Sequence, residues 1–263
     1  MAESPKDITI SISGVIFASL FETMLPFVLA FFWIKKFNGK TSHILIGVGG
    51  FISSVLIESV FLFLISAIFG KETFMFYLFA GISPGLFEET GKYLFIKYIF
   101  SKDKQKNNAV SYGIGHGGIE SFGIGIALII QMCLKDTLIE KGSIKESITF
   151  SIFVMSALER LSAVTLHISL SVINYKAIRE PNINYYILAI ILHDLVDSVA
   201  FLKLKGILTS VYIIELIVGL FSLGLALYSY NLYINFKEKE EEKREKIIPL
   251  EEKKENTEIL DNY

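Results

Sequence analysis

Seven long apolar runs, separated by short polar breaks, constrain the fold of this chain more than any other feature. Hydrophobic residues make up 52% of its 263 residues. A helix needs about 20 predominantly apolar residues to cross the hydrocarbon core of a bilayer. The sequence therefore predicts an all-α, polytopic membrane protein with about seven transmembrane helices. The predicted spans are Ile8–Ile34, His43–Phe69, Phe74–Phe100, Asn108–Leu134, Ile148–Asn174, Ile183–Leu202 and Gly206–Phe236.

The sequence after Phe236 differs from the spans that precede it. Glu and Lys alternate there and aromatic residues are nearly absent, so this segment lacks the side chains that build a core. The polar breaks between the spans are too short for a further folded unit. We predict a single integral-membrane helical domain over residues 1–236 and a charged cytoplasmic tail, disordered or frayed-helical, over residues 237–263.

The distribution of Lys and Arg indicates how the chain crosses the membrane. Cytoplasmic loops carry an excess of these residues, and seven spans place the two termini on opposite sides. With the C-terminus inside, eight basic loop residues join the seven of the tail, against seven on the other side. We therefore expect a multi-pass protein of the cell membrane, with its N-terminus outside and its C-terminus cytoplasmic.

Several ionisable residues lie inside the predicted spans. A charged side chain at the bilayer centre costs about 2.5–3.5 kcal/mol or more, so such residues usually face a protein interior or a wet cavity. Counted inward from the loops on one side of the membrane, Glu88, His116, His167 and His193 lie roughly 10–18 Å deep. This shared depth favours one site over several unrelated polar contacts.

Two histidines are followed by an acidic residue one helical turn later. His116 and Glu120 are four residues apart, as are His193 and Asp197, so each pair lies on one face of its helix. A carboxylate in that position can orient the imidazole and select its tautomer. The alternative is plain interhelical hydrogen bonding, worth about 1–2 kcal/mol or less in a membrane bundle. Two such pairs at similar depth favour a catalytic role over plain hydrogen bonding.

A glutamate pair lies in the third predicted span. Glu88 and Glu89 are neighbours, so they point in different directions around the helix and need not share one role. Lys92 can neutralise either carboxylate, and the i,i+4 spacing slightly favours Glu88. The other carboxylate would then remain in a low-dielectric site, where a general base can be poised near neutral pH.

The fifth predicted span contains a further polar group. We expect Glu159 and Arg160 to form or join a buried ion network. His167 lies seven residues after Arg160, on nearly the same helix face, and is expected to support the site.

Four segments together form a wider pattern: Glu88-Glu89-Thr90-Gly91-Lys92-Tyr93, Tyr112 to Glu120, Glu159-Arg160 with His167, and His193 to Asp197. The combination resembles the YhfC family of intramembrane proteases. That family is similar to the type II CAAX prenyl endopeptidases (the CPBP or Abi group) and to PrsW proteases. Lys92 stands here in place of the more usual Arg, Tyr112 in place of Phe, and Asp197 in place of Asn.

The resemblance implies hydrolysis of a peptide bond in a membrane protein or lipidated peptide. Glu88 or Glu89 with His116 would activate water, and His193 with Asp197 would stabilise the oxyanion or orient the substrate. Family analogy ranks Glu88 first as the base, whereas the spacing of Lys92 favours Glu89, so both remain candidates. The supporting residues would be Lys92, Glu120, Glu159, Arg160 and His167.

Cofactor and partner expectations follow from the same residues. A glutamic-type mechanism requires no cofactor, and we assign no metal ligands, although two or three His with a Glu could hold zinc with an open water position. The expected partners are the lipid bilayer and the membrane-embedded or lipidated substrate, with no nucleic acid. Two other classes remain open, namely a proton-coupled transporter and a non-catalytic membrane scaffold. No internal repeat with matched broken helices supports the transporter.

Overall fold

The protein is helical through almost all of residues 8–99, 105–144, 146–204 and 207–236, which are the residues that the computed structural model describes. Within these ranges there are eight helices and no β-strand, so the predicted all-α fold is confirmed. The helices are α1 Ile12–Phe37, α2 Thr41–Phe69, α3 Phe74–Ile99, α4 Asn107–Cys133, α5 Lys135–Glu140, α6 Phe150–Arg179, α7 Ile183–Leu204 and α8 Val211–Ile234.

Five of the described helices, α1, α2, α4, α6 and α8, are long and apolar enough to cross a membrane. The chain is therefore a multi-pass membrane protein. Helices α3 and α7, with 26 and 22 residues, also have the length of a span. Both are less apolar because they contain ionisable residues, such as Glu88 and Glu89 on α3 and His193 and Asp197 on α7.

The predicted ends of the spans agree with the helices to within a few residues, except at two places. Helix α6 continues to Arg179, and its last turn contains Lys176 and Arg179, cations that the C-terminal end of a helix dipole favours. Helix α8 begins only at Val211. The short helix α5 was not predicted, since six residues show no clear period. The predicted tail, 237–263, lies outside the described residues.

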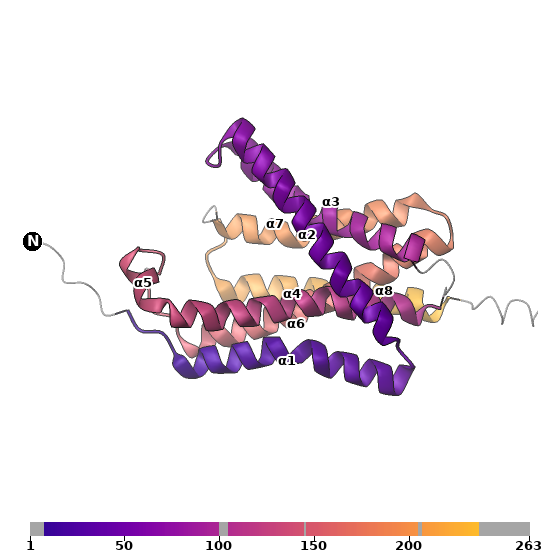
Figure 1. Cartoon of the computed structure of the whole chain (residues 1–263), viewed down its shortest axis with the longest axis horizontal. Helices are drawn as coiled ribbons and strands as arrows, with labels where there is room; N and C mark the ends of the chain where they lie inside the picture. The colour runs from indigo at the N-terminus through magenta and orange to yellow at the C-terminus, as the bar shows by residue number, and fades with distance from the viewer. Residues whose placement is uncertain (1–7, 100–104, 145, 205–206, 237–263) are drawn as a thin grey trace, which may run out of the picture.

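Helices α4 and α6 form the centre of the bundle (Figure 1). Helix α4 packs against α1, α2 and α6, and α6 packs in addition against α3, α7 and α8. Glycine allows these close approaches: a Cβ at Gly113 would collide with the backbone of Ile168 on α6, and one at Gly115 with the carbonyl of Ile44 on α2. The glycine-rich part of α4 therefore holds His116 tightly between its neighbours.

Helix α2 crosses the bundle obliquely, and its far end stands away from the other long helices together with the start of α3 (Figure 1). Its buried residues are concentrated in its first half: His43, Gly47, Gly50 and Ser54, with Ile65 alone in the second half. On α3 the buried residues begin at Ser83 and Gly85, next to Pro84. The glutamate pair thus lies just where α3 joins the bundle.

Candidate functional site

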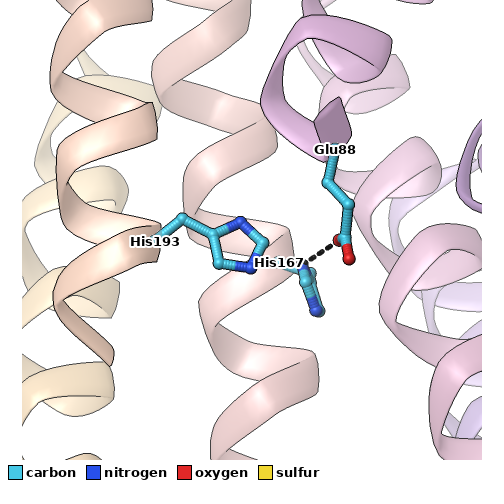
Figure 2. A group of neighbouring side chains, drawn as sticks. All are labelled: Glu88, His167 and His193. Carbon is cyan, nitrogen blue, oxygen red and sulfur yellow. Dashed lines mark ion pairs between the residues drawn. The ribbon is translucent and has the colours of Figure 1, made fainter. Parts of the chain in front are cut away.

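Acidic and imidazole side chains from four helices converge inside the bundle. Glu88 on α3 lies with its Oε2 atom 2.8 Å from Nε2 of His116 on α4 and 3.9 Å from Nδ1 of His167 on α6. The ring centroids of His116 and His167 are 4.9 Å apart, and those of His167 and His193 are 5.2 Å apart. Figure 2 shows Glu88, His167 and His193 approaching one another from three helices. His167 therefore contacts the rings of both other histidines.

Glu89 is completely buried and surrounded by donors. Lys92 forms an ion pair with Oε1, and Nδ1 of His193 lies 2.7 Å from the same oxygen. The Nδ2 group of Asn174 on α6 donates to Oε2 at 2.7 Å. Both carboxylate oxygens are therefore occupied, and this carboxylate ties α3 to α6 and α7.

The i,i+4 spacing favours a pair between Lys92 and Glu88, but the structure pairs Lys92 with Glu89 at i,i+3. Both separations bring side chains together on a helix. The rotation of α3 in the bundle decides between them, because it turns Glu89 and Lys92 fully into the interior, where each side chain is 0% exposed. A buried charge needs a partner, so these two charges neutralise each other.

Glu88 is far less constrained than its neighbour. Among the described residues it makes one hydrogen bond, through Oε2 to His116, and its side chain is 9% exposed. The ring of His116 packs against Phe51 and Tyr112, with centroids 5.2 and 5.8 Å away. Its Nδ1 atom is buried without a hydrogen-bond partner among the described residues. Glu88 is thus the carboxylate with an oxygen left for a further ligand or a water.

His167 is held at both ring nitrogens. Nδ1 lies 3.0 Å from Nζ of Lys92, and Nε2 lies 2.6 Å from Oε2 of Glu120. An ammonium group only donates and a carboxylate only accepts, so His167 accepts at Nδ1 and donates at Nε2. Glu120 in turn accepts from Nη1 of Arg160 at 2.7 Å, and Arg160 also pairs with Glu159. The expected ion network on α6 is present and extends into the site through His167.

Two expected relationships turn out differently. Glu120 pairs with His167 and Arg160 on α6, whereas His116, four residues before it on α4, pairs with Glu88. His167, which the spacing to Arg160 places beside the site, lies at its centre. Spacing along one helix identifies which side chains share a face, but the partner helices determine which contacts form.

The other expected pair is close: Nε2 of His193 lies 3.5 Å from Oδ2 of Asp197. Asn174 is a member of the cluster that sequence reasoning missed. A signal for it exists, because it lies seven residues after His167 and therefore on the same face of α6.

The residues also suit a divalent metal ion by donor type. Glu88, His167 and His193 each offer one ligand atom, and these atoms lie within 4.8 Å of one another. Two histidines and a glutamate form a known ligand set of catalytic zinc. Nδ1 of His167 contacts Lys92, so a cation bound through that nitrogen would have to replace the lysine contact.

The chain is thus a polytopic membrane protein with an ionisable site inside its helical bundle. Two glutamates and three histidines are buried there. The profile of the YhfC intramembrane metalloprotease family matches residues 21–218, and the chain belongs to this family. The matched range contains every candidate site residue from Glu88 to Asp197.

One curated relative is the "Uncharacterized membrane protein YhfC" of Bacillus subtilis (strain 168), to which the chain is 26% identical over 170 residues. The alignment covers 57% of this chain and 66% of the relative, just under two thirds of its length.

Proposed function

We propose that this protein is an intramembrane endopeptidase that hydrolyses a peptide bond in a membrane protein or a lipidated peptide. The observation that carries the proposal is the contact between Glu88 and His116, 2.8 Å long and buried, beside a second glutamate whose oxygens are both occupied. A general base needs a carboxylate within reach of water, and Glu88 meets that need better than Glu89.

Glu88 would accept a proton from a water molecule while the oxygen of that water attacks the carbonyl carbon of the substrate. His116 would donate from Nε2 to Oε2 of Glu88, which leaves Oε1 to face the water. The proton then passes from Glu88 to the departing amine nitrogen as the carbon–nitrogen bond breaks. The products are a new carboxylate and a new amine.

His193 would stabilise the oxyanion that develops on the substrate carbonyl. Its Nδ1–H group donates to Glu89, so an imidazolium form has Nε2–H available for the oxyanion. Asp197, 3.5 Å from Nε2, would stabilise that imidazolium. Lys92 and Asn174 would act as positioning residues, because they fix Glu89 and thereby the ring of His193.

A zinc ion held by Glu88, His167 and His193 would, when bound, polarise a carbonyl and acidify a bound water. The family description and the donor types support this alternative. In that case His193 offers Nε2 as an acceptor, since Nδ1–H is donated to Glu89. Metal analysis of purified protein, with activity measured before and after chelation, separates the two forms of the proposal.

The experiment for the proposed function uses purified protein in proteoliposomes and fluorogenic peptides with an apolar membrane segment, with and without a lipid group. Cleavage by the wild type should fall sharply in Glu88→Gln, His116→Ala and His193→Ala, and should persist in Lys97→Gln, a control on the same helix as Glu88. Equal cleavage by all of these variants overturns the proposal. Proton uptake into the liposomes without any cleavage would instead indicate a proton-coupled transporter.

A further inference from the structure

An apolar cavity of about 400 Å³ lies between α1, α4, α6 and α8. It shares no residue with the proposed catalytic cluster on α3, α4, α6 and α7, which comprises Glu88, Glu89, Lys92, His116, His167, Asn174, His193 and Asp197. Trp33 and Phe37 line it from α1, Thr165 and Ser169 from α6, and Tyr233 from α8. Its volume lies within the range of small-molecule sites, about 300–1,000 Å³.

The serine and threonine hydroxyl groups in the cavity wall do not offer their protons to an occupant. Thr165, Ser169 and Ser229 each donate to a carbonyl oxygen of their own helix, at 2.8, 2.8 and 3.1 Å. Trapped water needs two to four polar partners, so this lining suits a hydrocarbon better than water. Along α6 the lining runs from Thr165 to Val172, about 10 Å at the rise of an α-helix. A stretch of acyl chain fits these dimensions.

Two lysines stand at one end of the cavity, each over an aromatic ring that lines it. Nζ of Lys36 is 5.6 Å from the ring centroid of Phe37, and Nζ of Lys106 is 5.1 Å from that of Tyr233. Helix α1 ends here and α4 begins here, and Nε1 of Trp33 donates to Ser111 at 2.9 Å between them. The lysines thus place positive charge beside the apolar cavity at the predicted cytoplasmic end of the bundle.

We propose that this cavity binds one acyl chain of an anionic phospholipid, with the lipid phosphate between Lys36 and Lys106. Basic pockets between transmembrane helices on the cytoplasmic side recognise anionic headgroups in this way. Positive charge at the mouth and hydrocarbon lining within match the two parts of such a lipid. The site is independent of the proposed protease activity, because none of its residues belongs to the catalytic cluster.

The chain contains a built-in reporter for this site. Trp33 is its single tryptophan and lines the cavity, so a brominated acyl chain inside the cavity would quench the intrinsic tryptophan fluorescence. The full-length protein is placed in nanodiscs that contain dibrominated phosphatidylglycerol or dibrominated phosphatidylcholine at matched mole fractions. The anionic lipid should quench more strongly at every fraction below saturation.

Removal of the charges should remove the preference. Lys36→Gln and Lys106→Gln should each weaken the preference for the anionic lipid about five-fold, the effect of one basic residue near an anionic surface. Lys97→Gln is the matched control: Nζ of Lys97 also stacks on rings, 5.3 Å from Tyr93 and 5.4 Å from Tyr98, but away from the cavity. It should leave the preference unchanged.

Filling the cavity gives a second, charge-independent readout. Ala226→Phe, inside the lining, should abolish the extra quenching by phosphatidylglycerol, whereas Leu223→Phe, exposed on the same helix, should not. Equal quenching by the two lipids in the wild type would overturn the proposal, as would undiminished quenching in a folded Ala226→Phe protein. Displacement of the bromolipid by a farnesylated peptide would also overturn it, and would assign the cavity to a substrate tail.

Discussion

The two halves of the proposed catalytic cluster are built in opposite ways. In the first half, Glu89 is surrounded by Lys92, His193 and Asn174, and both of its oxygens are occupied. In the second half, Glu88 has one hydrogen bond among the described residues, to His116. We call these the fixed half and the open half. Adjacent glutamates on one helix thus have very different environments.

This contrast shows how a membrane bundle can fix one buried carboxylate and leave its neighbour with an oxygen available. A buried charge must be paired, and the fixed half meets this requirement with an internal cation and two further donors. These contacts hold the ring of His193 against Glu89 and tie α3 to α6 and α7. Glu88 is the neighbour of Glu89 on α3, so the same contacts help to position it. The open half can then keep one oxygen unoccupied. We expect substitutions in the open half to abolish activity and those in the fixed half to reduce stability first.

The largest expected effect is that of Glu88→Gln. This change keeps the shape of the side chain but removes the base, so turnover should fall by about 100- to 10,000-fold. The melting temperature in detergent should stay close to that of the wild type, because Glu88 does not neutralise a buried cation, whereas Glu89 neutralises Lys92. Turnover within ten-fold of the wild type would show that Glu88 is not the base.

Glu89→Gln should chiefly destabilise the fold. The change leaves Lys92 as an uncompensated buried charge. Breaking a buried ion pair in this way lowers the free energy of unfolding by about 3–5 kcal/mol. Thermal unfolding of the purified protein measures it, with Glu88→Gln as the matched control. The double variant Glu89→Gln with Lys92→Met should recover part of the loss. A Glu89→Gln protein as stable as the wild type would erase the distinction between the two halves.

Asn174→Leu should have a smaller effect on the same half. It removes the donor to Oε2 of Glu89. A hydrogen bond to a charged group contributes about 1.5–3 kcal/mol to the free energy of unfolding. Because Asn174 acts through Glu89 and His193, we expect a lower kcat with little change in KM. Ser171→Ala, which alters a buried hydroxyl one turn away, serves as the control. An unchanged kcat in a folded Asn174→Leu protein would remove Asn174 from the positioning residues.

The last and smallest effect concerns the close packing of α4 against α2, which positions His116 in the open half. A Cβ at Gly115 would collide with the carbonyl of Ile44, so Gly115→Ala should push α4 and His116 away from α2. We expect destabilisation by about 1–3 kcal/mol, as for other overpacked sites. Gly123→Ala is the control on the same helix, because a Cβ there meets nothing within 4 Å. Equal melting temperatures for the two variants would argue against tight packing as the support of His116.

Hydrophobic run length predicted the helical membrane fold well, because a bilayer permits few structures other than apolar helices of suitable length. Depth counting placed Glu88, His116, His167 and His193 in one layer, and the structure shows them in one cluster. Both inferences depend on distances along single helices, which the sequence states directly.

Partner choice between helices was harder to predict. Spacing along α3 admits Lys92 beside either glutamate, and spacing along α4 admits Glu120 beside His116. The rotation and tilt of each helix select the observed contacts, Lys92 with Glu89 and Glu120 with His167. Asn174 escaped notice for a related reason, since an amide near the end of an apolar run has many ordinary roles. A single sequence does not specify these rotations.

The most direct measurement is isotope-labelled membrane proteomics of cells that express either the wild type or Glu88→Gln, grown briefly in water enriched with ¹⁸O. We predict new membrane-protein fragments in the wild type whose C-terminal carboxylates carry ¹⁸O, as hydrolysis by water requires. These fragments should be absent with Glu88→Gln and present with Lys97→Gln. Identical labelled fragments with the wild type and Glu88→Gln would contradict the assignment of Glu88 as the base of an intramembrane protease.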